Sequence, residues 1–369
     1  MTRGVTSPWE QLFAPPGKPE SSLTLAFRLV RKRGEPLLLL PTNRHALSAA
    51  LAFYPAQTVK AKLARGLLGA FLRAGLPMGT ESVVVQTDAG SPFLRFATAP
   101  EAVSAGDCFA VLFGNPCAPG RRLMLLMLDR EGRPRKVIKA GTNACAQALV
   151  RAEAAFLNSN AADVLHAPAL LGEFTGDAIA ALALDYVPGK SPKADAVQPL
   201  ADLLSSWLIP ERKVKFFALP AGQRLRIAAV NDRRWPVLEA RLAEAEFHPA
   251  IFHGDFAPWN VRVDPVTQRW RVLDWERGEA AGPPAWDWFH FVIQNEILVR
   301  HTPTERLVER VAGLIGSPEF ESYAHRAGIE ACVRPLLLAY LFYCRAVLKQ
   351  AEGLKQIEMF LERCDFLMT

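Results

Sequence analysis

The spacing of apolar and polar positions predicts a mixed α/β region at the start of the chain. Two apolar runs around the polar residues 31–36 are typical of strands joined by a turn, and two longer segments have apolar side chains at helical spacing. The strands predicted in this region cover residues 23–30, 37–40, 83–85 and 93–96, and the helices cover residues 44–53 and 58–76. The pattern identifies no chemistry here.

The pattern becomes clearer after residue 106. The strands predicted next cover residues 108–113, 122–128, 136–140 and 178–186. A helix that Thr142 or Asn143 can cap runs from there to about residue 157. From residue 197 the spacing is mainly helical, apart from short strands within residues 252–274. A strand-rich half followed by a helical half predicts an α+β protein of two lobes, joined near residues 187–189.

Composition excludes a mostly disordered or fibrous protein. The chain has 369 residues, of which 50% are hydrophobic and 22% charged, so it can bury a large core divided among two or three domains. The longest apolar run, residues 335–344, is about half of what a membrane span needs and predicts a buried helix. No secretory signal is evident, and the six cysteines are isolated. We therefore expect a cytoplasmic protein with reduced thiols.

The net charge of +6 is concentrated at one end of the chain. Residues 1–105 contain 12 basic and 6 acidic residues, and the rest of the chain is balanced. This region could contact nucleic acid or anionic lipid. A solvated basic face is the simpler interpretation, because the basic cluster at residues 31–33 is short and has no interleaved aromatic side chains. We therefore expect no membrane partner, and nucleic acid is not favoured.

A candidate metal site lies in the helical half. Asp255 and Asn260 share one loop, which is followed by a short apolar strand, a turn and a second strand that ends at Asp274. This strand pair can return Asp274 to the loop. Two carboxylates and an amide oxygen that converge in this way suit Mg²⁺, and one carboxylate would remain to orient or deprotonate a hydroxyl.

The spacing of these residues resembles a known family. His253-Gly254-Asp255, then Asn260 and, 14 residues later, Asp274 are similar to the catalytic and metal-binding loops of aminoglycoside phosphotransferases and choline kinases, relatives of the protein kinases. Asp-Trp-Glu in place of Asp-Phe-Gly is typical of the small-molecule branch. The resemblance covers roughly residues 106–350. It implies a two-lobed protein-kinase-like fold with an N-lobe at residues 106–188 and a helical C-lobe at 189–369. It leaves residues 1–105 unexplained, and we expect these to form an N-terminal α/β extension of unknown role.

The resemblance also implies roles for individual residues. Asp255 would be the base or the hydroxyl-orienting group, and Asn260 and Asp274 would hold Mg²⁺ on the nucleotide phosphates. His253 would shape the loop rather than exchange protons. Asp287, in a Trp-Asp-Trp segment, resembles the aspartate that braces the catalytic loop.

The other lobe of a kinase supplies a cation to the phosphates. Lys139, in the strand at residues 136–140, stands where a kinase lysine is expected, and Glu153 interrupts the apolar stripe of the next helix. A carboxylate that points inward needs a partner, so we expect a Lys139–Glu153 ion pair. A solvated Glu153 at the edge of the stripe is the alternative.

Two further positions follow from the lobe's expected layout. The loop that begins at Gly114 lies where kinases cover the phosphates, although it lacks G-x-G-x-x-G and reads equally well as a plain hairpin turn. Backbone groups of Asp185 and Val187 would reach adenine at the hinge.

Together these features predict an enzyme that transfers the γ-phosphate of ATP, or GTP, to a small-molecule hydroxyl. The aromatic residues near the site could stack on a sugar or enclose a quaternary ammonium, or form core. Residues 106–369 are neutral overall, which favours a sugar or amino-alcohol over a polycationic antibiotic. The alternatives are a non-catalytic kinase-like module whose basic N-terminal region binds a partner, and a protein serine/threonine kinase, which the absence of an evident activation loop disfavours.

Overall fold

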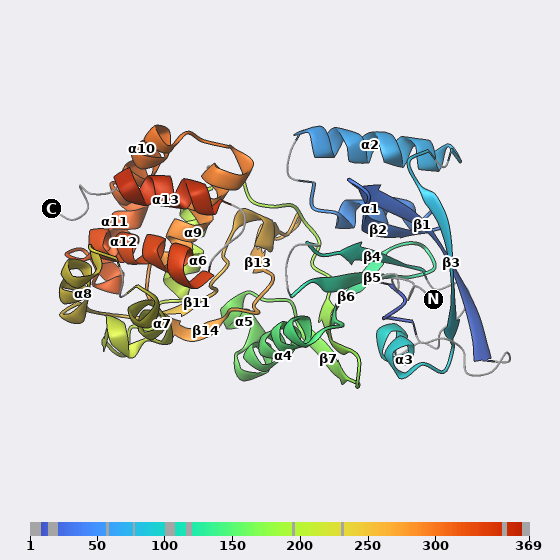
Figure 1. Cartoon of the computed structure of the whole chain (residues 1–369), viewed down its shortest axis with the longest axis horizontal. Coiled ribbons are helices and arrows are strands. Elements are labelled where there is room, and N and C mark those ends of the chain that lie inside the picture. The colour runs from blue at the N-terminus through green and yellow to red at the C-terminus, as the bar shows by residue number, and fades with distance from the viewer. Residues whose placement is uncertain are drawn as a thin grey trace. The chain divides into compact units, whose positions relative to one another are not determined.

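The computed structural model divides into two compact units, which are described separately (Figure 1). The first comprises Met1–Ser159 and Pro168–Val187, and the second comprises Asn160–Ala167 and Pro188–Thr369. The structure describes residues 9–13, 21–56, 59–76, 78–99, 108–115, 120–193, 196–229, 232–348 and 353–363.

The first unit is built on one eight-stranded antiparallel sheet in the order β3-β1-β2-β4-β5-β6-β8-β7. The leading region continues this sheet, because β2 pairs with β4 through Leu38–Leu112 and Leu39–Val111. The strands are β1 (Ser22–Lys32), β2 (Glu35–Pro41), β3 (Glu81–Asp88), β4 (Cys108–Phe113), β5 (Arg122–Leu128), β6 (Pro134–Gly141), β7 (Leu170–Thr175) and β8 (Ala180–Asp185).

Alternate side chains of this sheet bury two apolar clusters, as the two-residue period of a strand requires. Leu38 and Leu40 belong to the cluster that includes α1, whereas Leu39 belongs to the other. The helices of the unit are α1 (Leu47–Phe53), α2 (Val59–Arg73), α3 (Pro92–Thr98) and α4 (Ala144–Ser159). Asn143 is the residue that caps α4, since its Oδ1 accepts a hydrogen bond from the Ala146 amide at 2.9 Å.

Two elements of this unit differ from the sequence prediction. Residues 93–96 form part of helix α3, not a strand. Pro92 stands in the first turn of that helix, where its fixed φ and missing N–H favour a helical start. Strand β7 was not predicted, because its residues alternate between half-buried and exposed and include a glycine.

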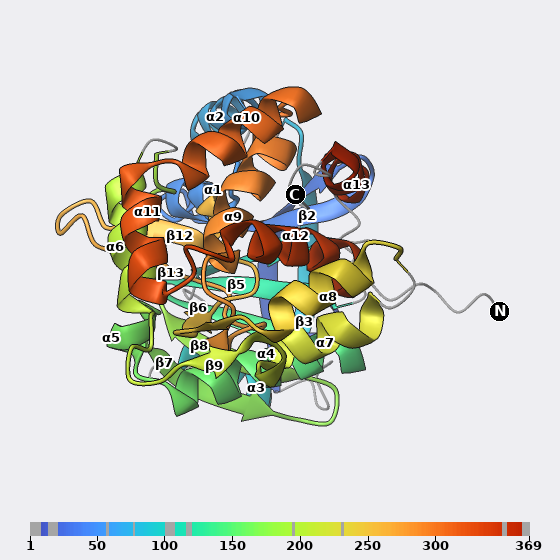
Figure 2. The ribbon, with the colours of Figure 1, turned by 90° about the vertical axis from the view of Figure 1, so that its left-hand side faces the viewer.

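The second unit is mainly helical, as predicted, and α12 packs against α8, α9 and α13 (Figure 2). Its helices are α5 (Ala162–Leu165), α6 (Val197–Ser206), α7 (Pro220–Ala228), α8 (Trp235–Ala243), α9 (Trp286–Gln294), α10 (Thr304–Ile315), α11 (Pro318–Ala327), α12 (Val333–Tyr343) and α13 (Leu354–Arg363). Its short strands are β9 (Val214–Lys215), β10 (Glu246–Phe247), β11 (Ala250–Phe252), β12 (Val261–Val263), β13 (Trp270–Val272) and β14 (Glu279–Gly282).

The two units together give the α+β class that the sequence predicts. The apolar run at residues 335–344 forms most of helix α12, whose side chains from Pro335 to Tyr343 are all buried. Within the described residues, none of the helices combines the length and the apolar character that a bilayer span requires.

Candidate active site

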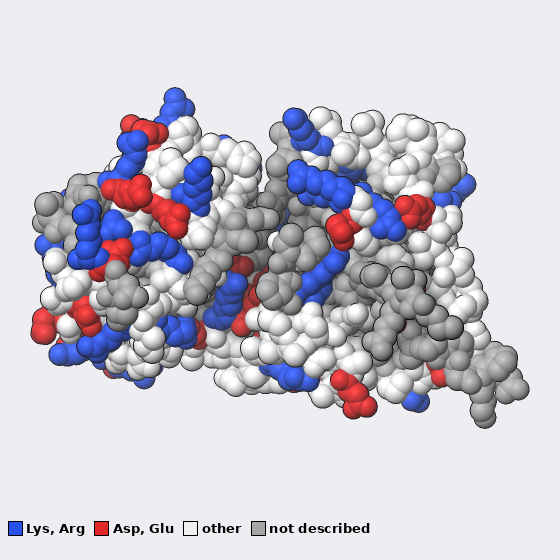
Figure 3. Space-filling view, in the orientation of Figure 1, with Lys and Arg blue, Asp and Glu red and all other residues white. Residues whose placement is uncertain are grey.

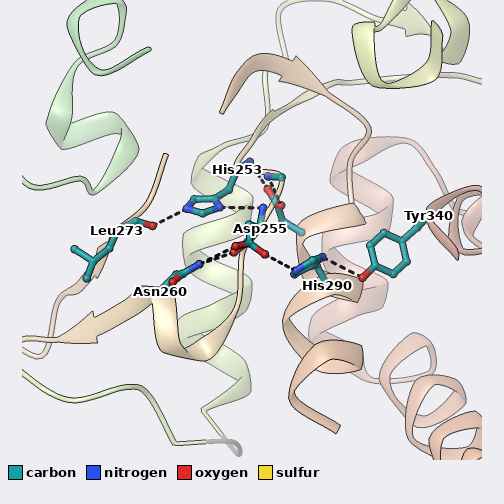
Figure 4. A network of polar contacts seen from close by, with 8 residues as sticks. His253, Asp255, Asn260, Leu273, His290 and Tyr340 are labelled. Carbon is teal, nitrogen blue, oxygen red and sulfur yellow. Dashed lines mark hydrogen bonds and ion pairs between the residues drawn. The ribbon is translucent and has the colours of Figure 1, made fainter. Parts of the chain in front are cut away.

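A short hairpin gathers the predicted site residues of the second unit. Strands β12 and β13 pair antiparallel, so that Val261 lies opposite Val272, and the residues just outside the hairpin meet at its open end. There the Leu273 amide donates to the carbonyl of Asn260 at 2.7 Å, and His253 Nε2 contacts the carbonyl of Leu273 at 2.8 Å (Figure 4). The backbone just before Asp274 is thus tied both to Asn260 and to the loop that carries Asp255.

Asp287 fixes the start of that loop. Its buried carboxylate, in the first turn of α9, accepts hydrogen bonds from the amides of His253 at 2.7 Å and of Gly254 at 3.1 Å. Burial raises the pKa of Asp287 to about 7 despite these two donors. Gly254 has φ +78°, and a Cβ there would lie 2.9 Å from the carbonyl oxygen of Arg277, so the tight turn requires glycine.

His253 is held on both ring nitrogens by backbone groups. Nδ1 accepts from the Asp255 amide at 3.2 Å, which leaves Nε2 to donate to the Leu273 carbonyl. Complete burial lowers the pKa of His253 to about 4, so the ring is neutral near pH 7. This geometry suits a residue that shapes the loop.

The neutral state of His253 predicts a pH-dependent stability. Because the pKa in the folded state lies below the ordinary value of 6.5, the unfolded chain binds the proton more tightly. The contribution of His253 is therefore complete above pH 6.5 and is lost as the pH falls toward 4, with a loss on the order of 3 kcal/mol. We expect the free energy of unfolding of the wild type to approach that of His253→Gln over this range.

Urea unfolding of both proteins at each pH measures this difference. Asp287 titrates in the same range with the opposite sign, since its raised pKa stabilises the fold at low pH and that contribution is lost as the pH rises to about 7. The comparison with the variant cancels this term. A difference that stays constant between pH 4 and 7 would contradict the assignment.

Asn260 and Asp274 have the donor chemistry of a magnesium site. Asn260 is buried, and its Nδ2 donates to the Asp255 carbonyl at 2.9 Å, an orientation that leaves Oδ1 as the ligand atom. Asp274 holds its half-buried carboxylate on a backbone with φ +74°, a conformation that costs an L residue ~1–2 kcal/mol. A carboxylate and an amide oxygen are ligands that Mg²⁺ accepts, so the residues present fit the ion.

Two site residues escaped the sequence prediction. His290 Nε2 lies 3.1 Å from Asp255 Oδ1, and the hydroxyl of Tyr340 lies 3.1 Å from His290 Nδ1 (Figure 4). Both side chains are buried, whereas the side chain of Asp255 is 27% exposed. Burial raises the pKa of Tyr340 well above its usual value, so its hydroxyl stays protonated and can donate to Nδ1. His290 then carries its proton on Nε2 and donates to Asp255.

The spacing of His290 gave one signal that could have located it. It lies three residues after Asp287 on α9, which places both side chains on the same helix face. No comparable signal marked Tyr340, because every side chain of α12 from Pro335 to Tyr343 is buried.

The expected ion pair is present in the first unit. Lys139 Nζ on β6 lies 2.6 and 2.8 Å from the two carboxylate oxygens of Glu153 on α4. The residues are only 4% and 0% exposed, so the alternative of a solvated Glu153 is wrong. The pair holds the lysine ammonium in a fixed place on the sheet.

The structure gives less support to the other nucleotide-binding positions predicted in this unit, which are Gly114, Asp185 and Val187. The Gly114 amide donates to the Arg122 carbonyl at 3.0 Å, as in a hairpin, and residues 116–119 of its loop lie outside the described residues. Asp185 is exposed, and its amide donates to the Ala169 carbonyl at 2.9 Å, so this N–H is not available to adenine. Val187 is the last residue of the unit.

The aromatic residues near the motif mostly form core. No surface is exposed on Trp275, Trp286, Trp288 or Phe289. Each of these rings packs against another buried ring, with the two ring centroids 4.9–5.8 Å apart, as is typical of aromatic clusters. Trp259 alone among the rings of this segment is half-buried. Of the two interpretations that the sequence left open, contact with an acceptor or core packing, the structure supports core packing for the tryptophans of α9 and for Trp275.

Comparison with known proteins places the chain in a family. No curated protein sequence matches it significantly. Among similar solved structures, a type VIII aminoglycoside-3'-phosphotransferase is 20% identical, covers 67% of this chain and 97% of its own, and has a TM-score of 0.40. An aminoglycoside phosphotransferase from Streptomyces rimosus is 19% identical, with 59% and 87% coverage and a TM-score of 0.39.

A third similar structure is a thermostable variant of the enzyme APH(4)-Ia in a ternary complex with ADP and hygromycin B. It is 15% identical, covers 70% of this chain and 92% of its own, and has a TM-score of 0.42. These identities are too low to carry a substrate from any of the three enzymes to this chain. The model of the phosphotransferase enzyme family, in contrast, matches residues 128–325, more than half of the chain, which include the Lys139–Glu153 pair and Asp255, Asn260, Asp274, Asp287 and His290. The chain therefore belongs to the phosphotransferase enzyme family.

Proposed function

We propose that the protein is a small-molecule kinase that transfers the γ-phosphoryl group of ATP, or GTP, to a hydroxyl of a sugar-like acceptor. The observation that carries this proposal is the set of backbone hydrogen bonds that ties Asp255, Asn260 and Leu273-Asp274 together. This set presents one partly exposed carboxylate beside two oxygen ligands.

Phosphoryl transfer has a loose transition state, so the protein acts mainly by positioning groups and neutralising charge. Asn260 and Asp274 would hold Mg²⁺, which when bound offsets the charge of the phosphate oxygens. Lys139, fixed by Glu153, would bind phosphate oxygens through its ammonium group. His253 and Asp287 would keep the loop in shape without entering the reaction.

Asp255 would accept the proton of the acceptor hydroxyl. His290 Nε2 contacts Oδ1 at 3.1 Å, whereas the contact of Oδ2 with Asn260 Nδ2, at 3.4 Å, is long. Oδ2 is therefore the oxygen best placed to receive an incoming hydroxyl. His290 acts on this reaction only through Asp255, which makes it a positioning residue.

The burial of the aromatic side chains bears on the acceptor. An aromatic cage for a quaternary ammonium needs several exposed ring faces, and Trp275, Trp286 and Trp288 have none. Polar groups are left to recognise the acceptor, which favours a neutral, hydroxyl-rich molecule over a choline-like amino-alcohol.

A nucleotide-consumption screen tests the proposed function. Purified protein with Mg²⁺ and ATP or GTP is offered sugars, amino-alcohols, aminoglycosides and nucleosides, and the product is checked for a new phosphate ester by mass spectrometry. We expect turnover with at least one neutral hydroxylic acceptor. Consumption confined to aminoglycosides would refute the acceptor class, and the absence of any phosphorylated small molecule would refute small-molecule kinase activity.

The role of His290 predicts unequal effects of two conservative variants. His290→Gln can place an amide N–H near the position of Nε2 and keep the donor to Asp255, whereas His290→Asn replaces only Nδ1. We expect kcat to fall about 100-fold in His290→Asn and much less in His290→Gln, with little change of KM for the nucleotide. Steady-state kinetics and thermal melting of both variants measure this. Equal losses of kcat that follow equal losses of stability would indicate a purely structural histidine.

A further inference from the structure

Helix α2 exposes an apolar stripe that the enzyme site does not explain. Leu63, Leu67 and Phe71, spaced four residues apart, are 64%, 61% and 37% exposed, and Leu76 and Met78 after the helix are 49% and 59% exposed. Four-residue spacing places the first three on one face. Five of the twelve exposed large apolar side chains in the described part of the chain lie within residues 63–78, so this surface is a concentrated patch.

The opposite face of α2 anchors the helix. Leu72 is buried in the cluster formed with α1, and a Cβ on Gly69 would lie 3.2 Å from Leu51 Cδ1. Arg65 Nη1 donates to the Tyr54 carbonyl at 2.9 Å. The helix therefore already buries an apolar face in its own unit, and the outward stripe is a second one.

The segment of the chain that carries the stripe has charges of a single sign. Residues 36–80 contain no aspartate or glutamate, and their five basic residues are Arg44, Lys60, Lys62, Arg65 and Arg73. Lys60, Lys62 and Arg73 are exposed. Figure 3 shows a broad uncharged surface at the top of the first unit, bordered below by Lys and Arg side chains with a few Asp or Glu side chains among them. The basic excess of the first 105 residues thus includes a structured helix face.

We propose that the outward face of α2 docks on an anionic lipid surface. An amphipathic helix with leucine and phenylalanine on one face and lysine or arginine at its borders lies flat in the membrane interface, where acidic head groups attract the basic side chains. Charge complementarity favours a lipid surface over a second copy of this chain. If two copies paired through α2, the lysine and arginine side chains of both helices would come together, and neither helix carries an Asp or Glu to neutralise them. The three large apolar side chains on the outward face also favour the hydrocarbon of a lipid bilayer over nucleic acid, whose phosphate backbone is charged.

This proposal is independent of the catalytic site and departs from the expectation of no membrane partner. The helix would lie on the bilayer and would not span it. The enzyme would then work at a membrane surface, where an acceptor with a lipid part or a lipid-bound substrate would be concentrated. Membrane binding can be measured without any turnover, so its test is independent of the test of the proposed kinase activity.

Co-sedimentation of the full-length protein with vesicles tests the proposal. Vesicles of phosphatidylcholine alone are compared with vesicles that contain phosphatidylglycerol. We expect binding to the anionic vesicles that weakens with salt, and an affinity about tenfold lower for Leu67→Ser/Phe71→Ser. Lys60→Glu/Lys62→Glu is expected to lose binding to a similar extent.

Matched controls come from other exposed positions. Ile227 is 78% exposed on α7, so Ile227→Ser removes an apolar side chain elsewhere, and Lys355→Glu on α13 reverses a charge elsewhere. Both are expected to bind like the wild type. Failure of the wild type to bind anionic vesicles, or equal loss in the controls, would overturn the proposal. Light scattering that shows a dimer dissociated by Leu67→Ser/Phe71→Ser would assign the face to a second copy instead.

Discussion

Replacing Asp255 with asparagine is expected to lower the rate of phosphoryl transfer by about 10³-fold and to leave the fold and nucleotide binding intact. Asparagine keeps an oxygen that can accept from His290 Nε2, which lies 3.1 Å from Oδ1 in the wild type. It cannot take a proton from an acceptor hydroxyl. The loss should therefore fall on kcat, as measured by product formation with a saturating acceptor, and calorimetric titration should show unchanged nucleotide affinity.

Asp202→Asn supplies the matched control for this experiment. Asp202 is exposed on α6 of the same unit, and its carboxylate accepts a hydrogen bond from Gln198 of the same helix at 2.8 Å. The control should turn over like the wild type. An Asp255→Asn enzyme that works at the normal rate would remove Asp255 from the reaction.

Breaking the Lys139–Glu153 pair is expected to destabilise the protein by about 3–5 kcal/mol for either single variant, Lys139→Met or Glu153→Gln. Both residues are almost fully buried, and the ammonium lies 2.6 Å from the carboxylate. Removal of one partner leaves a polar or charged group in the interior without its ion-pair partner. The double variant Lys139→Met/Glu153→Met should lose much less free energy of unfolding than the two single variants together, because an apolar pair can replace a buried ion pair at little cost.

Urea unfolding of the singles and the double measures this coupling directly. Glu131→Gln is the control, since Glu131 pairs with Arg133 at the surface, where the two side chains are 64% and 72% exposed. Such a pair contributes ~0–1 kcal/mol. If Glu153→Gln were as mild as this control, the Lys139–Glu153 pair would not be the buried interaction described.

Local patterns were enough to predict two groupings of the candidate site residues. The polar residues at either end of two short apolar runs identified the hairpin that joins Asn260 to Leu273-Asp274. The interruption of an apolar helical stripe identified Glu153 and led to its partner Lys139. In each case the signal lies within one or two adjacent elements, where the period of strand or helix fixes which side chains share a face.

The positions that were missed depend on packing between distant elements. Tyr340 reaches His290 from α12, 50 residues further along the chain, and no local pattern relates the two. The aromatic residues of α9 were compatible with a ligand site as well as with core packing, and their burial assigns them to the core. Residues 93–96 (Phe-Leu-Arg-Phe) suit either a strand or a helix, and here the deciding signal, Pro92 in the first helical turn, was local and was overlooked.

The leading region shows the same limit. Apolar runs predicted strands in residues 1–105. Those strands join the same sheet as the later strands because β2 pairs with β4, and this pairing depends on tertiary contacts that no local pattern reveals. Helical spacing predicted α2, yet only the structure shows that Leu72 faces inward while Leu63 and Leu67 face outward.

A crystal structure with Mg²⁺ and a non-hydrolysable ATP analogue tests the central claim most directly. The account predicts one metal ion at about 2.0–2.1 Å from an oxygen of Asn260 and of Asp274, with the Lys139 ammonium on the phosphates and Asp255 Oδ2 open toward the γ-phosphate. A nucleotide bound elsewhere, or phosphates that contact neither Lys139 nor a metal on Asp274, would contradict it.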